Sequence, residues 1–125
     1  KHWQDRKPCL NIAVECNDEV DALQAAIRIH VFRVIQECLT NIVRHAEAQQ
    51  VVIALKMQEN SLYLSVKDDG KGFDLMDLLH SNKNEKQLGL RGMEERVGLL
   101  EGKMKIQSRL MKGTKIFIKV PFKSL

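Results

Sequence analysis

The apolar residues of this chain follow two different spacings, one of two residues and one of three or four. The switches between these spacings limit the fold more than any other feature. They alternate with polar residues from Leu10 to Val14, which predicts a strand. From about Asp18 to Ala46 they recur at steps of three and four, which predicts a helix with a break near Ala25. Alternation returns in the runs VVIALKM and SLYLSVK, which are separated by a short polar stretch and predict a hairpin.

The second half of the chain repeats this change of period after a polar segment. Phe73–Gln87 contains one short apolar patch and is expected to be a loop. The stretch from Arg91 to Gly102 predicts a second helix that ends at its glycine. The runs KMKIQSRL and TKIFIKVPF predict a closing hairpin that turns at Met111, Lys112 and Gly113.

The predicted order is strand, helix, two strands, loop, helix and two strands. Hairpins place neighbouring strands antiparallel, and helices must cover an apolar face of the sheet. We therefore expect an α+β fold, a two-layer sandwich whose mainly antiparallel mixed sheet is covered on one face by helices. Leu62, Leu64 and Val66 are expected to face those helices. With 125 residues and 44% apolar content, the chain is expected to form one domain over residues 1–125.

Composition argues against several classes of protein. The three cysteines have no CxxC spacing and cannot all pair, so we expect a reducing compartment, with Cys16 and Cys38 as small core residues. No apolar run reaches the roughly 18 residues of a membrane-spanning helix, and KHWQDRKPCLN lacks the apolar stretch of a signal peptide. The net charge of +4 favours polyanions, but the basic residues are scattered and aromatic residues are few. No nucleic-acid partner is expected.

The stretch KDDGKGFDLM combines two adjacent carboxylates with two glycines. A hairpin turn at Asp69 and Gly70 would need a strand directly after it, but the residues from Phe73 onward do not alternate. Two glycines one residue apart suit positive φ or the close approach of another group, and a carboxylate beside them can accept hydrogen bonds from an amino group. The pattern therefore favours a ligand-binding loop over a simple turn.

Polar residues on the first predicted helix form a second candidate group. At about 100° per residue, Glu37, Asn41, Arg44 and His45 share one arc at the rim of the apolar face, where a cleft would lie. A solvated helix face with an ion pair is the plainer interpretation of the same arc. Further along, the glycine pair of LGLRGMEER is expected to open a helix whose free N–H groups suit an anion.

Four stretches resemble, in order and spacing, the N, G1, G2 and final GT-strand motifs of the ATP-binding domain of histidine kinases. They are QECLTNIVRHA, VKDDGKGF, GLRGMEER and GTKIFIKVP, and the resemblance covers nearly the whole chain from about Leu10. The first and third are most similar to the branch of nitrate-sensor, hexose-phosphate-sensor and DesK-like kinases. The superfamily is that of the GHKL, or Bergerat-fold, ATPases, whose α/β sandwich agrees with the one derived above.

The resemblance implies nucleotide contacts for the first two motifs. Asp68 matches the aspartate that accepts a hydrogen bond from the adenine amino group. Asp69 is the variable residue of DxGxG and is expected to face solvent or to bond to the turn. Gly70 and Gly72 are implied to let the backbone pass close to the base. Asn41 matches the side chain whose oxygen binds Mg²⁺.

Other roles follow from the same resemblance. Glu37 is implied to orient a metal-bound water or the incoming acceptor, Arg44 to face the phosphates, and His45 to pack beside the nucleotide. Gly89 and Gly92 are implied to let a lid fold over the phosphates. The remaining implied nucleotide contacts are Leu90, Arg91, Met93 and Thr114.

The implied function is that of the ATP-binding catalytic domain of a two-component sensor histidine kinase, with ATP and Mg²⁺ as cofactors. The domain would transfer the γ-phosphate to a histidine of an upstream dimerisation domain absent from this chain, and a response-regulator receiver domain would then take it. Residues 1–9 would be the linker from that upstream domain, and the parent protein would be a homodimer. The domain would be cytoplasmic, with anchoring of its parent in the inner membrane left open.

Two alternatives remain at this point. One is a GHKL ATPase that uses Glu37 to activate water. The other is an ATP-binding sensing or scaffolding module that transfers nothing. The isolated chain is in any case expected to bind ATP but to transfer little.

Overall fold

The fold is taken from a computed structural model that describes residues 10–17, 25–74 and 85–121. In this part of the chain five strands form one sheet in the order β1-β2-β3-β5-β4. β1 pairs parallel with β2, and every other neighbouring pair is antiparallel. The elements in chain order are β1 (Asn11–Cys16), α2 (Ala25–Asn41), a π-helix (Ile42–Ala46), β2 (Gln50–Gln58), β3 (Ser61–Asp68), α4 (Glu85–Leu99), β4 (Lys103–Ser108) and β5 (Thr114–Pro121).

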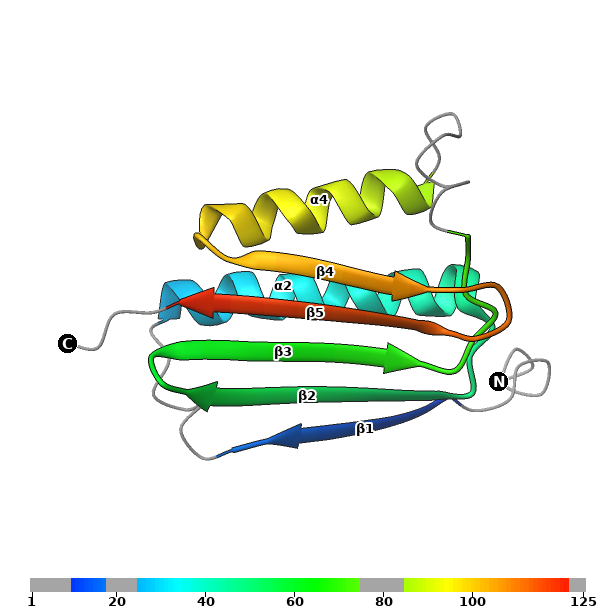
Figure 1. Cartoon of the computed structure of the whole chain (residues 1–125), viewed down its shortest axis with the longest axis horizontal. Helices are drawn as coiled ribbons and strands as arrows, with labels where there is room; N and C mark the ends of the chain where they lie inside the picture. Colours follow the sequence, from blue (N-terminus) through cyan, green and yellow to red (C-terminus); the bar gives the residue numbers. More distant parts are fainter. Residues whose placement is uncertain (1–9, 18–24, 75–84, 122–125) are drawn as a thin grey trace.

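Both helices lie on the same side of the sheet, as Figure 1 shows. The predicted two-layer α+β sandwich with a mainly antiparallel mixed sheet is therefore confirmed. Leu62, Leu64 and Val66 of β3 are all buried at this interface, as their alternation predicts. The helices contribute buried apolar residues of their own, among them Val34 of α2 and Val97 of α4.

The two predicted hairpins are present, and their turns explain the strand registers. Glu59 and Asn60 between β2 and β3 both have positive φ, at 50° and 63°, which matches the right-handed twist of the flanking strands. Between β4 and β5 the chain turns through Met111 and Gly113, also with positive φ. Asp69 and Gly70 do not form a hairpin turn, because β3 is followed by an irregular loop.

Two sequence predictions about these elements were wrong in detail. The second helix begins at Glu85, not at Arg91, because EKQL consists of good helix formers that extend it towards the N-terminus. Cys16 is exposed on the edge strand β1, whereas Cys38 is buried as expected. The first helix ends at Ala46, as expected, with its last five residues in π-helical geometry. The expected break near Ala25 borders residues 18–24, which lie outside the described part of the chain, as does most of the loop expected at Phe73–Gln87.

No helix in the described part of the chain is both long enough and apolar enough to span a bilayer.

Candidate functional site

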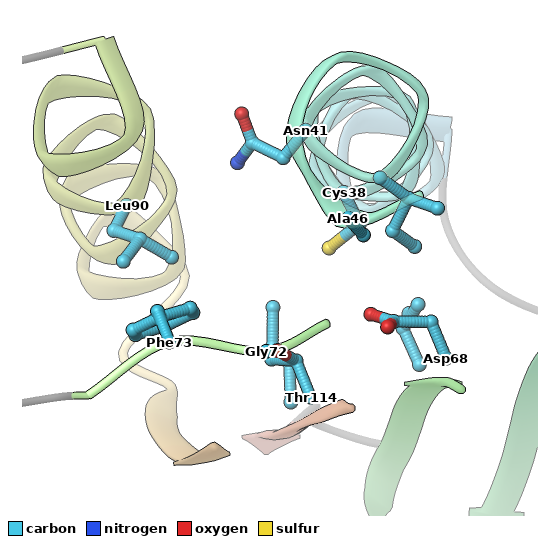
Figure 2. A pocket seen from close by; sticks show the side chains of 11 residues that line it. Cys38, Asn41, Ala46, Asp68, Gly72, Phe73, Leu90 and Thr114 are labelled. Atoms are coloured by element: carbon cyan, nitrogen blue, oxygen red, sulfur yellow. The ribbon is translucent and has the colours of Figure 1, made fainter. Parts of the chain in front are cut away.

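A pocket lies between the two helices and the ends of β3 and β5 nearest the loop that follows Asp68. Figure 2 shows Asn41 on α2 and Leu90 on α4 facing the same gap, with Asp68, Phe73 and Thr114 around it on the sheet side. Elements far apart in sequence thus meet at one place. The complete lining is Cys38, Asn41, Ile42, Ala46, Val66, Asp68, Gly72, Phe73, Leu90, Thr114 and Ile116.

Asp68 is the buried carboxylate of this pocket, with only 6% of its surface exposed. It is the last residue of β3, and its register partner on β5 is Thr114. Asp68 Oδ1 accepts a hydrogen bond of 2.8 Å from the backbone N–H of Gly70. This bond fixes the carboxylate at the floor of the pocket, where it can accept a hydrogen bond from a ligand donor.

Asp69 serves a different purpose from its neighbour. Its Oδ1 accepts hydrogen bonds from the backbone N–H groups of Gln49 and Gln50, at 2.8 and 2.9 Å, and so ties the loop to the start of β2. These two bonds favour the charged form and lower the pKa of the Asp69 carboxyl below its ordinary value. Asp69 is therefore exposed, as expected, but it bonds to the start of β2 and is not among the residues that line the pocket.

Both glycines of the loop are required by contacts within the protein. A Cβ on Gly70 would lie 2.3 Å from the carbonyl oxygen of Ala46, and one on Gly72 would lie 2.1 Å from that of Arg109. Gly72 also has a φ of +60°, which side-chain-bearing residues rarely adopt. The glycines thus let the loop pack between the π-helix and the β4–β5 turn, where the backbone N–H of Lys71 donates to Ala46 at 2.7 Å.

The residues expected to share an arc of the first helix do not all line one pocket. Asn41 lines the pocket with Asp68, whereas Glu37 lines a second groove between the helices, together with Arg33, Thr40, Gly92 and Arg96 among others. Arg44 is exposed in the π-helix, and His45 belongs to the same π-helix. Glu37 and Asn41 lie one turn apart on α2, whereas an arc drawn at 100° per residue no longer applies to Arg44 and His45 in the π-helix.

The third motif lies inside α4 and not at its start. Leu90 lines the pocket, Met93 is buried, and Arg91 and Gly92 are exposed. Gly89 is the fifth residue of a helix that begins at Glu85. The expectation that the two glycines open a helix is therefore wrong, and their N–H groups are not those of a free helix N-terminus.

Six of the eleven pocket residues escaped the site prediction, namely Cys38, Ile42, Ala46, Val66, Phe73 and Ile116. Phe73 ends the quoted VKDDGKGF motif, and its backbone N–H donates to Ser108 Oγ at 3.0 Å, which ties the loop to β4. Cys38 is buried with its Sγ 3.4 Å from the Sδ of Met93. Burial, aided by the nearby negative charges of Glu37 and Asp68, raises the pKa of the Cys38 thiol to about 12. Cys38 therefore stays protonated and lines the pocket as a small apolar group.

A metal at this site would depend on the nucleotide for most of its ligands. Among the described residues there is no group of three or more His, Cys, Asp or Glu side chains that could hold an ion. The amide of Asn41 is an oxygen donor that faces the gap between the helices. This donor fits Mg²⁺, which usually takes one or two protein ligands together with waters and substrate phosphates.

Comparison with known families agrees with this arrangement. Residues 26–124 match the model of the family described as histidine kinase-, DNA gyrase B-, and HSP90-like ATPase. The chain belongs to this family.

Members of this ATPase family resemble the chain in sequence and in structure. The chain is 39% identical over 114 residues to the signal transduction histidine-protein kinase/phosphatase DegS of Bacillus subtilis, covering 90% of this chain and 29% of DegS. It is 42% identical over 91 residues to the sensor histidine kinase YdfH of the same organism, covering 72% of this chain and 22% of YdfH. The chain thus spans less than a third of the length of these relatives.

Solved structures support the same fold. The histidine kinase AdeS of Acinetobacter baumannii superposes with a TM-score of 0.72 at 18% identity, over 98% of this chain and 59% of that chain. The blue-light activated histidine kinase of Erythrobacter litoralis gives a TM-score of 0.70 at 22% identity, over 93% of this chain and 36% of that chain.

Proposed function

We propose that this chain is the ATP-binding catalytic domain of a sensor histidine kinase and that it supplies the γ-phosphate for transfer to a histidine on another domain. The observation that carries the proposal is the meeting of a buried carboxylate, Asp68, with the amide of Asn41 at one pocket. The curated relatives named above, which are histidine kinases, agree with it. The parent protein is proposed to be a homodimer with a cytoplasmic kinase domain.

The pocket suits an adenine base. Its lining is apolar except for a few polar groups, which is typical of sites that bury a flat heterocycle and orient it by hydrogen bonds. Asp68 would accept a hydrogen bond from the adenine amino group, and Thr114, opposite it on β5, would border the same edge of the base. Leu90 and Phe73 would provide apolar contact.

The phosphates would extend from this pocket along the gap between α2 and α4. Asn41 would bind Mg²⁺, which neutralises phosphate charge when bound. The second groove between the helices is lined by Arg33 and Arg96, whose guanidinium groups would suit the terminal phosphate. Glu37, in the same groove, would orient the acceptor imidazole. Arg44, Arg91 and the glycines Gly89 and Gly92 remain proposed contacts of the phosphate end, with His45 beside the nucleotide.

Catalysis in this arrangement consists of positioning and charge neutralisation. The acceptor imidazole, delivered by the upstream dimerisation domain, would attack the γ-phosphorus in line as the bond to ADP breaks. A receiver domain of a response regulator would then accept the phosphoryl group.

Transfer of labelled phosphate tests the function. We expect the chain mixed with the upstream helical domain of its parent protein and γ-labelled ATP to form phosphohistidine. Release of free phosphate alone would instead favour an ATPase that uses Glu37 to activate water. Tight ATP binding with neither product would favour a sensing or scaffolding module.

The variant Asp68→Asn tests the site in the same preparation. Replacing one carboxylate oxygen with an NH₂ group turns an acceptor towards the adenine amino group into a donor, so we expect ATP affinity measured by calorimetry to fall by at least tenfold. Glu94→Gln, an exposed change on α4, removes the same charge and should leave affinity unchanged. Equal affinities of both variants and the parent chain would exclude Asp68 as the adenine contact.

A further inference from the structure

The face of the sheet away from the helices carries charge of one sign. Figure 1 shows this face towards the viewer, with α2 passing behind β4 and β5. In the strand registers, every second side chain of β2 to β5 points to this face, opposite to the buried positions. We define the lysine face as the surface formed by Lys56, Tyr63, Lys67, Lys103, Lys105, Lys115, Phe117 and Lys119.

The described strands place little negative charge against these six lysines. Glu15, on the edge strand β1, is the single acidic residue of the described strands whose register places it on this face. Within the described part of the chain, none of the six lysines forms an ion pair. Two of them lie over aromatic rings: Lys115 Nζ is 4.6 Å from the centroid of Phe117, and Lys119 Nζ is 5.6 Å from that of Tyr63.

The positions of the lysines oppose the stability of the sheet. Lys67 lies directly opposite Lys115, and Lys103 lies opposite Lys119. Like charges in such cross-strand positions repel each other and destabilise the pair. Lysines on an edge strand prevent unwanted strand pairing, and this role accounts for the two lysines of β4. That reason does not apply to β3 and β5, which are interior strands. An anionic partner would remove the repulsion on these interior strands.

The chemistry of the face favours a lipid surface over other polyanions. Protein interfaces are depleted in lysine, and stacking of nucleic-acid bases needs open aromatic faces, whereas here lysines already lie over Phe117 and Tyr63. Flexible lysines suit a surface of many delocalised negative charges, and rings between them suit the headgroup level. We propose that the lysine face binds the surface of a bilayer containing anionic phospholipids. The pocket on the helix side would then face away from the bilayer.

Vesicle binding tests this proposal with the complete chain. We expect it to co-sediment with vesicles of phosphatidylcholine and phosphatidylglycerol at low salt, and not with vesicles of phosphatidylcholine alone, with binding that weakens as salt is added. Each lysine near an anionic surface contributes about fivefold to binding, so Lys115→Gln with Lys119→Gln should weaken it roughly 25-fold. The control, Arg28→Glu, changes the net charge by the same two units at an exposed position of α2 and should weaken binding much less.

A second double variant separates lost binding from lost folding. Lys67→Gln with Lys103→Gln removes the other member of each opposing pair, so it should weaken vesicle binding equally while leaving the unfolding temperature unchanged or higher. Equal losses in the lysine and arginine variants would overturn the proposal, because net charge alone would then explain binding. Binding to duplex DNA without binding to anionic vesicles would also overturn it, and none of these outcomes depends on whether ATP is bound or transferred.

Discussion

Asp68 and Asp69 are adjacent, yet one is buried in the pocket and the other is exposed and bonded to the backbone of Gln49 and Gln50. At the scale of single residues, this difference predicts how stability depends on pH. The pKa of Asp69 lies below the ordinary value of 3.8 in the folded state. Its contribution to stability is therefore present above that value and is lost as pH falls through the folded pKa.

The variant Asp69→Ala measures this contribution. We expect the free energy of unfolding to fall by about 1 kcal/mol at neutral pH. This loss is small for two hydrogen bonds to a charged acceptor, because the Asp69 carboxylate is exposed to solvent. Below about pH 4 the parent chain loses the same contribution, so the difference between the two should shrink. Asp69→Asn keeps an acceptor oxygen and should lose less at neutral pH. Urea unfolding at several pH values checks this, and a deficit that stays constant into acid would contradict it.

Sequence reasoning could separate these aspartates only in part. The resemblance to the DxGxG motif singled out Asp68. From the same motif we expected Asp69 to face solvent or to bond to the turn. It could not identify the bond partners, because Gln49 and Gln50 belong to a different segment and carry no motif. The same limit applies to Cys38 and Phe73, whose apolar lining of the pocket depends on packing and not on a sequence pattern.

At the scale of elements, the two glycines Gly72 and Gly92 should respond oppositely to the same change. Gly72→Ala places a methyl group 2.1 Å from a backbone oxygen at a φ of +60°, so we expect a loss of about 2 kcal/mol or more in the free energy of unfolding. Gly92 lies inside α4 with open space around it, so Gly92→Ala should stabilise the chain by about 0.5–1 kcal/mol. Denaturant unfolding measures both. A Gly72→Ala variant as stable as the parent chain would show that the loop does not need this conformation.

Elements were predictable where the period of apolar residues was clear. Alternation located β2, β3, β4 and β5, and their hairpins followed from the short separations between them. Alternation also located β1, but it cannot reveal parallel pairing with β2, which depends on a long connection. The start of α4 was missed because Glu85 and its neighbours follow a polar stretch without apolar periodicity.

At the scale of the whole molecule, the sheet gathers residues that the sequence disperses. The lysines of β2 to β5 looked scattered along the chain, and only the strand registers bring them to one face. The pocket is assembled in the same way on the opposite side, from both helices, a loop and two strand ends. A ligand in that pocket would therefore bridge most elements of the fold and should stabilise them together.

Thermal unfolding with and without nucleotide tests this coupling. A ligand at a hundred times its Kd adds about 2.7 kcal/mol to the free energy of unfolding, which for a domain of this size corresponds to a rise in Tm of roughly 10 °C. We expect this rise with ATP and Mg²⁺, a smaller one when a chelator removes the Mg²⁺, and little at the same ATP concentration for Asp68→Asn. The control Glu94→Gln should rise like the parent chain. An equal rise for Asp68→Asn and the parent chain would mean that ATP stabilises the fold from some other site.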